Sequence, residues 1–387
     1  MNFEEHAAKP LLAAAGIATP PGELATSAQE AEAAAARIGA CVIKAQVPAG
    51  KRGKAGGIKL AGNPAQAGAA AAEILALEIG GHKVAKVLVE AQVPIAAEYY
   101  AAVLNDPETK GPIILFSAAG GIEIEDLAAT RPETLLRLPV DVRHGPARGA
   151  IEAGLAGLGL AAAHLGAVAK VLERLYAAYR EHDAELLEIN PLALTGDGRL
   201  VALDCKFILD DSALPRRAEL AESGTPESLT GLEAKGRALG LRFIELDGSV
   251  GVLANGAGLT MTTIDAVRHY GGEPANFLEI GGDAYVKAAP ALELVLANPK
   301  VKSLLINFCG AVARTDVMTG GVLDAWDQLK PELPVFFSIH GTGEEEAVAM
   351  LRARLGLEPF DLMDDAVKAA VEAAGEAAGE AAGEAAK

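Results

Sequence analysis

The sequence predicts a mixed fold of two domains: an α+β domain over residues 1–240, followed by an α/β domain with a doubly wound parallel sheet over 241–370. The chain has 387 residues, more than a single hydrophobic core usually supports. Its first part mixes strand and helix patterns irregularly, whereas residues 248–347 repeat a strand, a glycine turn and a helix four times. The composition is 51% hydrophobic but only 4% aromatic, which favours close helix–sheet packing.

The first domain begins with a short amphipathic helix, expected at residues 3–16 and ended by the sequence ATPPG. Ser27 and Glu30 have the spacing of a capping box, which predicts a second helix that ends near Gly39. Branched residues indicate three strands, and helical patterns lie between them. The strands are expected at 41–47, 84–93 and 98–106, and the helices at about 64–79 and 147–180.

A polar stretch with Pro and Gly at 210–229 predicts a connection or an exposed arm. The second domain then begins, and its four strand segments each run into a glycine turn and a helix. Such turns lie at the carboxyl edge of a doubly wound sheet, where ligands of these folds bind. Residues 371–387 repeat EAAG and form a low-complexity tail, which we expect to be a frayed helix or disordered because each repeat contains a glycine.

The formal net charge of −18 argues against nucleic acid or an anionic membrane as a partner. No stretch approaches the roughly 20 apolar residues of a membrane span. The first residues carry acidic side chains where a signal peptide would be basic, and Lys9 and Pro10 interrupt the apolar run. Three widely spaced cysteines without a CxxC pair fit a reducing compartment, so we expect a cytoplasmic protein.

The loop sequence KAQVPAGKRGKAGG, residues 44–57, combines glycines with cations in an acidic chain. Glycines let backbone N–H groups approach an anion, and Lys51, Arg52 and Lys54 add positive charge. The spacing of a P-loop is absent. The loop is therefore interpreted as a lid over phosphates; the alternative is a solvated, flexible loop.

Residues 184–206 read as a hairpin whose loop contains the sequence TGDGR. If residues 196–198 form the loop, three cross-strand pairs follow: Leu194 with Leu200, Asn190 with Asp204, and Glu188 with Lys206. The four polar residues then share one face. An amide oxygen and a carboxylate side by side are hard oxygen ligands of the kind that Mg²⁺ takes, with phosphates and water completing its shell. The alternative is an ordinary polar face.

Two further groups of residues suggest ligand contacts. Glu90 and Glu98 flank a bend between two strands, where their carboxylates could accept hydrogen bonds from adenine and ribose or cap a turn. The turns of the second domain direct helix N-termini toward a common edge, which suits a carboxylate or phosphate but also occurs in any doubly wound domain. These turns are Asn255–Gly258, 281–283, 310–314 and 341–343. His340 has no partner by spacing and is expected to be structural or exposed.

Taken together, the motifs resemble the β subunits of succinyl-CoA synthetase (ADP-forming) and of malate–CoA ligase. The motifs are KAQVPAGKRGKAGG, AAGGIEIE, EINPL with ALDCK, NGAGLTM, GGEPANFLEIGG and INFCGAVARTD, in the same order and at matching spacing from residue 1 to about 370. The resemblance implies an ATP-grasp domain followed by a flavodoxin-like domain. It also implies a ligase that binds Mg²⁺ and ATP and works in a hetero-oligomer with an α subunit. That subunit binds coenzyme A and carries a histidine that is phosphorylated.

The resemblance also assigns residues. Asn190 and Asp204 match magnesium ligands, and Glu188 matches the glutamate that approaches the phosphohistidine. The nucleotide contacts are matched by Lys44, Lys51, Arg52, Gly53, Glu90, Val93 and Glu98, although Lys51 stands where the family usually has Gly. The carboxylic-acid site is matched by Asn255, Gly310, Ala311, Val312 and Ala313.

The chain departs from the family pattern in the loop and at the acid-binding edge, at Pro48, Asp283, Ala311 and His340. Asp283 is interpreted as a helix N-cap, or alternatively as a carboxylate facing the acid site. Succinate is the leading substrate. The alternatives are a malate–CoA ligase β subunit, and a non-catalytic paralogue that binds nucleotide and regulates or assembles. Glu188, Asn190 and Asp204 together favour an enzyme.

Overall fold

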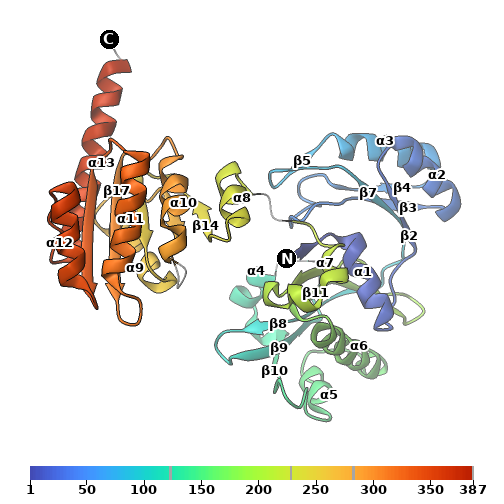
Figure 1. The fold of residues 1–387 in the computed structure, drawn as a ribbon. Helices are drawn as coiled ribbons and strands as arrows, with labels where there is room; N and C mark the ends of the chain where they lie inside the picture. The colour runs from blue at the N-terminus through green and yellow to red at the C-terminus, as the bar shows by residue number, and fades with distance from the viewer. Residues whose placement is uncertain (122–123, 227–228, 281–283, 386–387) are drawn as a thin grey trace. The chain divides into compact units, whose positions relative to one another are not determined.

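The computed structural model describes residues 1–387 apart from 122–123, 227–228, 281–283 and 386–387 (Figure 1). The chain divides into two compact units, Met1–Glu227 and Ser228–Lys387. The boundary expected at residue 240 falls inside the second unit, between α8 (Gly231–Ala238) and β14 (Phe243–Glu245). The polar stretch 210–229 holds the 3-10 helix η2 (Asp211–Arg216) and α7 (Ala218–Ala221), just before the division.

The first unit contains a four-stranded antiparallel sheet with two helices on one face (Figure 1). In sheet order the strands are β2 (Gly22–Ala25), β7 (Val87–Ala91), β3 (Cys41–Ala45) and β4 (Ile58–Ala61), and the helices are α2 (Ala28–Ile38) and α3 (Pro64–Leu75). Side chains alternate across a strand, so Ile43 and Val89 pack in the core with the helices. Lys44 and Glu90 therefore project from the opposite face.

A larger antiparallel sheet forms the rest of the first unit. Its order is β1 (Asn2–Phe3), β13 (Lys206–Leu209), β11 (Ala184–Leu194), β8 (Ala97–Asp106), β9 (Gly111–Ser117) and β10 (Leu135–Pro139), with β12 (Leu200–Ala202) paired to β11. One core joins this sheet to α1 (Glu5–Ala14), α5 (Ala150–Leu155) and α6 (Ala162–Glu181). The remaining short elements are α4 (Ile124–Thr130), η1 (Pro132–Thr134), β5 (Glu78–Ile79) and β6 (His82–Lys83). Every strand pair in this unit is antiparallel among the described residues, which confirms the predicted α+β character.

The second unit is a parallel sheet with helices on both faces, as predicted. The strands β15 (Val250–Ala254), β17 (Ser303–Gly310) and β18 (Val335–Gly341) form a parallel ladder. On one face α9 (Ala257–His269) and α13 (Met363–Ala385) pack over Val252 and Leu305. On the other face α10 (Ala284–Leu296), α11 (Thr315–Leu329) and α12 (Glu344–Leu355) pack over Leu253 and Ile306.

The remaining predicted strand, β16 (Asn276–Leu278), lies beside β15 and is linked to it by isolated parallel bridges at Pro274 and Glu279, just outside its two ends. Between the bridges, the Asn276 amide donates to the Val252 carbonyl at 2.8 Å and accepts from the Val252 N–H at 3.1 Å. A side chain thus replaces two ladder bonds of the parallel sheet. On its other side, β16 pairs antiparallel with β14.

One local expectation needs correction, and one of the two alternatives for the tail is observed. Residues 147–180 are not one continuous helix: α5 ends at Leu155 and α6 begins at Ala162, with Gly159 between them at φ 71°. Gly is costly inside a helix and supplies the left-handed backbone of a break. The tail is helical as far as Ala385 as part of α13, and Ala374 on this helix is buried in the core.

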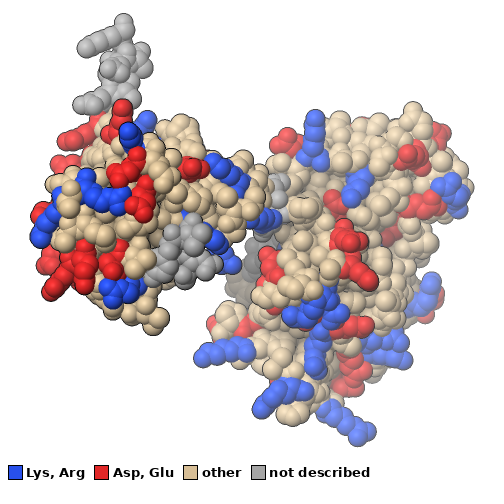
Figure 2. Space-filling model, viewed as in Figure 1, with Lys and Arg blue, Asp and Glu red and all other residues tan. Residues whose placement is uncertain are grey.

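The surface carries both signs of charge. On the face shown in Figure 2, acidic and basic side chains are interspersed over each unit. Among the described residues, no helix combines the length and the apolar character that crossing a membrane requires.

Candidate functional site

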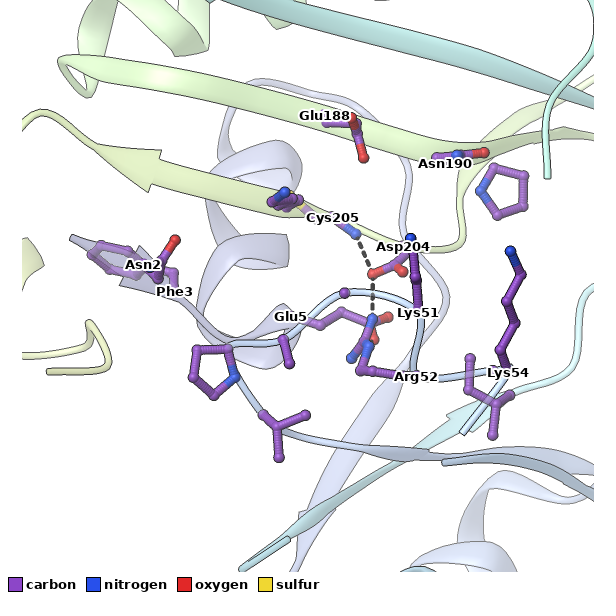
Figure 3. A pocket seen from close by; sticks show the side chains of 18 of the residues that line it. Asn2, Phe3, Glu5, Lys51, Arg52, Lys54, Glu188, Asn190, Asp204 and Cys205 are labelled. Atoms are coloured by element: carbon purple, nitrogen blue, oxygen red, sulfur yellow. Dashed lines mark hydrogen bonds and ion pairs between the residues drawn. The ribbon is translucent and has the colours of Figure 1, made fainter. Parts of the chain in front are cut away.

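A cavity of about 510 Å³ lies within the first unit, between the loop after β3 and the polar face of the β11–β13 hairpin (Figure 3). The loop contributes Val47 to Lys54, including Lys51, Arg52 and Gly53. The hairpin contributes Glu188, Asn190, Asp204 and Lys206. The structure therefore brings together two motifs, at residues 44–57 and 184–206, that are more than 120 residues apart in the sequence.

The predicted hairpin register is confirmed at both ends. Leu194 pairs with Leu200, and Glu188 pairs with Lys206. The ladder is interrupted between these pairs, where the chain contains the cis peptide Asn190-Pro191. The predicted partners Asn190 and Asp204 lie at this interruption and both line the cavity.

The hairpin oxygens already accept hydrogen bonds from neighbouring elements. Asn190 Oδ1 accepts from the Gly121 N–H at 2.9 Å, and a Glu188 carboxylate oxygen accepts from the Tyr100 hydroxyl at 3.0 Å. Asp204 Oδ1 accepts from the Cys205 N–H at 2.8 Å and from Arg52 Nη2 at 2.7 Å. Both contacts use the same Asp204 oxygen. Amide and carboxylate oxygens that face one cavity fit a hard divalent cation such as Mg²⁺.

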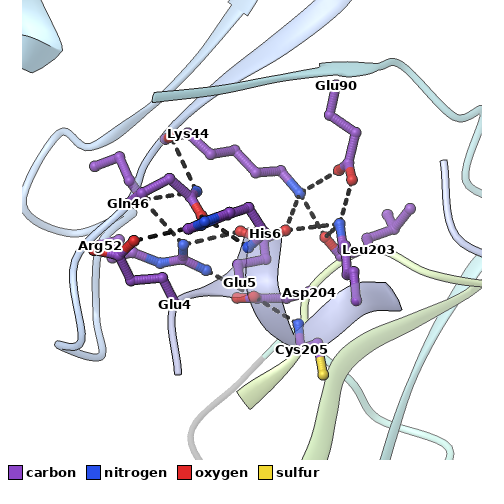
Figure 4. A network of polar contacts seen from close by, with 12 residues as sticks. Glu4, Glu5, His6, Lys44, Gln46, Arg52, Glu90, Leu203, Asp204 and Cys205 are labelled. Atoms are coloured by element: carbon purple, nitrogen blue, oxygen red, sulfur yellow. Dashed lines mark hydrogen bonds and ion pairs between the residues drawn. The ribbon is translucent and has the colours of Figure 1, made fainter. Parts of the chain in front are cut away.

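Beside the cavity lies a buried network of charged side chains around Lys44 (Figure 4). Lys44 Nζ donates to Glu5 Oε1 at 2.9 Å, to Glu90 Oε2 at 2.5 Å and to the Leu203 carbonyl at 2.5 Å. Lys9 also contacts Glu5, Glu90 and the same carbonyl. Two carboxylates and two ammonium groups therefore neutralise one another in the interior.

Arg52 connects this network to the cavity. Its guanidinium lies 2.9 Å from Glu5 Oε2, donates to the Ala45 carbonyl at 3.0 Å and reaches Asp204 on the hairpin. Arg52 is 8% exposed, so its position is fixed by these partners rather than by solvent. Glu5 and Asp204 thus hold Arg52, a candidate for binding phosphate, from two sides.

The burial of these groups opposes their ionisation, but their partners outweigh it. Burial alone would raise the pKa of Glu5, yet Lys44, Lys9 and Arg52 hold it well below its usual range. Burial alone would lower the pKa of Lys44 and of Arg52. Glu5 with Glu90 raises the pKa of Lys44, and Asp204 with Glu5 raises that of Arg52. All three groups stay charged near neutral pH.

Four of the residues assigned to the nucleotide do not line the cavity. Lys44 and Glu90 belong to the buried network beside it. Val93 lies half-buried between β7 and β8, and Glu98 lies half-buried at the start of β8. Glu98 is nevertheless close to the loop that contacts Asn190: its backbone carbonyl accepts from Gly120, and a Cβ added to Gly121 would meet its carboxylate at 2.4 Å. Glycine at 121, with φ 73°, allows this close approach.

The residues assigned to the acid site come together within the second unit, at the carboxyl edge of its sheet. The Asn255 amide donates to the Cys309 carbonyl at 2.9 Å and accepts from the Cys309 N–H at 2.8 Å. The following turn, Gly310 to Ala313, is connected to the next strand because Thr342 donates to the carbonyls of Gly310 and Ala311. Val312 is fully exposed, at 101%.

The departures from the family pattern lie in different places. Pro48 lines the cavity of the first unit, and Ala311 lies in the exposed turn of the second. His340 is half-buried at the end of β18, and its Nδ1 lies 3.8 Å from a carboxylate oxygen of Glu344. Asp283, with the rest of the turn 281–283, lies outside the described residues.

Sequence reasoning missed Glu5 and Lys9. Both are buried on α1, at 2% and 6% exposure, together with Ala8 and Leu12. The spacing of these four residues places them on one helix face. A charged pair at i and i+4 within the apolar stripe was the available signal, since such residues are rarely buried unless paired.

Comparison with known proteins gives matches for both units. The ATP-grasp domain family matches residues 2–194, and the CoA-ligase family matches residues 253–371. The β subunit of the ADP-forming succinate–CoA ligase of Gemmatimonas aurantiaca is 42% identical over 372 residues, which are 95% of this chain and 97% of that protein. The β subunit of the GDP-forming enzyme of Thermus thermophilus is 43% identical over 361 residues, 92% and 94% of the two chains.

A solved structure shares the fold. The ATP citrate lyase of Methanothrix soehngenii, determined with citrate and coenzyme A, superposes with a TM-score of 0.71 over 96% of this chain and 99% of that chain, at 23% identity. The two units and their site thus define an acid–CoA ligase subunit with an ATP-grasp domain and a CoA-ligase domain. Within that class, the chain belongs to the family of succinate–CoA ligase β subunits.

Proposed function

We propose that this chain binds Mg-ATP in the cavity of its first unit and passes phosphate between the nucleotide and a histidine of an α-type partner subunit, to form or consume succinyl-CoA. The observation that carries the proposal is the meeting of Arg52 and Gly53 with Glu188, Asn190 and Asp204 around one cavity. Phosphoryl transfer needs positioned cations and oxygen ligands more than covalent chemistry, and this set supplies both.

Asn190 and Asp204 would hold the metal. Two protein oxygens are the usual contribution to a Mg²⁺ site, the remaining ligands being phosphate oxygens and water. Asp204 Oδ1 is engaged by Arg52 and by the Cys205 N–H, which leaves Oδ2 for the ion. Bound Mg²⁺ would neutralise charge on the phosphates during transfer.

Arg52 and Lys44 would bind the phosphates, and Gly53 would let the loop backbone approach them. Glu90, Val93 and Glu98 would contact the base and ribose from the connection between the two sheets. Lys44 remains protonated because Glu5 and Glu90 raise its pKa, and its ammonium group lies with these carboxylates in the buried network beside the cavity. The proposed nucleotide is ATP; relatives include both ADP-forming and GDP-forming enzymes.

Glu188 would position the partner's histidine. Its carboxylate is held by the Tyr100 hydroxyl and lines the cavity next to the proposed metal ligands. A carboxylate that accepts a hydrogen bond from one imidazole nitrogen leaves the other nitrogen free to exchange phosphate. Coenzyme A would be bound with the α subunit. The phosphohistidine would pass its phosphoryl group to the carboxylate of the acid, and the thiol of coenzyme A would then displace inorganic phosphate from the resulting acyl phosphate to give the thioester.

The acid would bind in the second unit, at Asn255 and the turn 310–313. Succinate is the proposed acid, and none of the contacts described here favours malate or a non-catalytic role. All three cysteines are free, which supports the proposed cytoplasmic location.

The test is reconstitution with an α-type subunit. We expect the chain alone to bind Mg-ATP but not to release ADP in response to succinate and coenzyme A. This release of ADP should occur only when the α-type subunit is added. Glu188→Gln should bind Mg-ATP normally and fail to phosphorylate the partner's histidine. Steady coenzyme-A-dependent turnover by the chain alone would contradict the relay.

A further inference from the structure

Lys51 has a backbone conformation that lysine rarely adopts. Its φ is 60°, in the left-handed region, which favours glycine because a Cβ there crowds the following carbonyl. The other non-glycine residues with positive φ in the described part of the chain are Lys110, Asp183 and Lys330. Of these four, Lys51 alone lines the cavity. A disfavoured conformation next to a site suggests a function for the side chain that it carries.

The Lys51 side chain extends from the loop toward the hairpin face, in the direction of Asn190 and Asp204 (Figure 3). Its neighbour Arg52 turns to Glu5 and Asp204 instead. Within the part of the chain that the structure describes, no carboxylate lies within ion-pair distance of Lys51, and the side chain is exposed to the cavity solvent.

The charges around the cavity show what Lys51 adds. The described lining contains the cations Lys51, Arg52, Lys54 and Lys206 and the carboxylates Glu5, Glu188 and Asp204. Without Lys51 these signs would balance. Arg52 already forms ion pairs with carboxylates, so an incoming anion must compete with them for its charge. The Lys51 ammonium can bind the anion without such competition.

We propose that Lys51 binds the terminal phosphate of the nucleotide, next to the metal held by Asn190 and Asp204. This inference rests on the proposed Mg-ATP function of the cavity. Mg²⁺ held by Asn190 and Asp204 would neutralise charge on the phosphates that react, so an ammonium group that points toward these two residues would lie near that end of the nucleotide. Lys51 therefore favours the triphosphate over the diphosphate.

The experiment measures binding of Mg-ATP and Mg-ADP to the full chain by isothermal titration calorimetry, together with the melting temperature. Lys51→Gly should weaken Mg-ATP binding by about tenfold, the effect of losing one charge-assisted contact, and Mg-ADP binding by less than roughly threefold. Its melting temperature should rise by about 1 °C, because glycine relieves the left-handed backbone. Lys51→Arg should keep most of the affinity for Mg-ATP.

Lys110→Gly is the matched control. Lys110 has φ 55° in the exposed turn between β8 and β9, so this variant removes the same charge and relieves the same backbone conformation away from the cavity. It should change the melting temperature alike and leave both affinities unchanged.

Unchanged Mg-ATP affinity in Lys51→Gly, or an equal loss for Mg-ATP and Mg-ADP, would overturn the assignment to the terminal phosphate while leaving the nucleotide site intact. A wild-type chain that binds neither nucleotide would instead contradict the proposed function itself. The two failures are thus told apart by the wild-type titration.

Discussion

Arg52 Nη2 lies 2.7 Å from Asp204 Oδ1, so the proposed phosphate-binding loop and the proposed metal-binding hairpin are joined by an ion pair across the cavity. Arg52 neutralises the carboxylate that the metal would need, and Asp204 neutralises the guanidinium that a phosphate would need. Binding of Mg-ATP would weaken this pair, because the metal would draw on the Asp204 carboxylate through Oδ2 and a phosphate would attract the Arg52 guanidinium. Metal and nucleotide should therefore bind cooperatively.

The ion pair predicts opposite effects of one substitution on two ligands. Arg52→Gln should weaken Mg-ATP binding by at least about tenfold, because a phosphate contact is lost. The same change should tighten the binding of Mg²⁺ alone by roughly threefold or more, because Asp204 no longer faces a competing cation. Calorimetric titrations with Mg²⁺ and with Mg-ATP test both signs. Weaker binding of Mg²⁺ alone would refute the competition.

Asp204→Ala and Asn190→Ala should each weaken Mg-ATP binding by about tenfold or more, since each removes one of two proposed protein ligands. The fold should persist, because the Asp204 side chain is 34% exposed at the cavity. Asp197→Ala is the control: Asp197 lies in the loop of the same hairpin, where it contacts Thr195 and Arg199, and it does not line the cavity. Equal affinities in all three variants would mean that the polar face holds no metal.

Glu5→Gln should lower the free energy of unfolding by about 3 kcal/mol, because it leaves buried cations without one of their carboxylates. Glu5 contacts Lys9, Lys44 and Arg52. Glu4→Gln on the preceding residue should cost less, because its partner Lys86 is 34% exposed and can be solvated. Urea unfolding of both variants measures the difference, and equal losses would show that the network around Glu5 has no special weight.

The contribution of the Glu5 carboxylate to the free energy of unfolding should also depend on pH. The pKa of Glu5 in the folded chain lies below its ordinary value of 4.5, so the unfolded chain takes up the proton first on acidification. The stabilising contribution is complete above about pH 4.5 and is lost as the pH falls below it. The stability gap between the wild type and Glu5→Gln should therefore narrow between about pH 5 and pH 3. A gap that stays constant over this interval would contradict the assigned charge state.

A substitution in the second unit should affect binding of the acid without affecting binding of the nucleotide. Asn255→Asp should raise the KM for succinate in the reconstituted enzyme by about tenfold, because a carboxylate cannot donate to the Cys309 carbonyl and adds negative charge near the acid. Mg-ATP binding should not change. If the KM stays constant while kcat falls, Asn255 acts on a later step than binding of the acid.

Local patterns were sufficient to predict the hairpin and the strand–turn–helix repeats. The hairpin register followed from one turn sequence, because a turn sets the pairing of the two strands that it joins. Leu194 pairs with Leu200 and Glu188 with Lys206, on either side of the interruption at Asn190. The glycine turns likewise marked the carboxyl edge where Asn255 and Gly310 meet. The break before α6 is also indicated by the glycines of 154–159, which interrupt the helical periodicity on either side.

Other features depend on tertiary contacts that no local window contains. The spacing of Glu5 and Lys9 places both on the apolar face of the first helix, but their partners Lys44 and Glu90 lie on strands that are distant in the sequence. The strand β16 reads as a regular member of the parallel sheet, yet the Asn276 side chain replaces its ladder bonds. In both cases the deciding partner lies far away in the sequence.

Among the described residues, the Asn255 amide makes its hydrogen bonds with backbone atoms of Cys309, so these bonds do not depend on the side chain at position 309. Cys309 is also suited to selective labelling, because it is exposed whereas Cys41 and Cys205 are buried. A thiol-reactive fluorophore should therefore attach at a single place in the unaltered protein, beside the proposed acid site, and report on its occupancy.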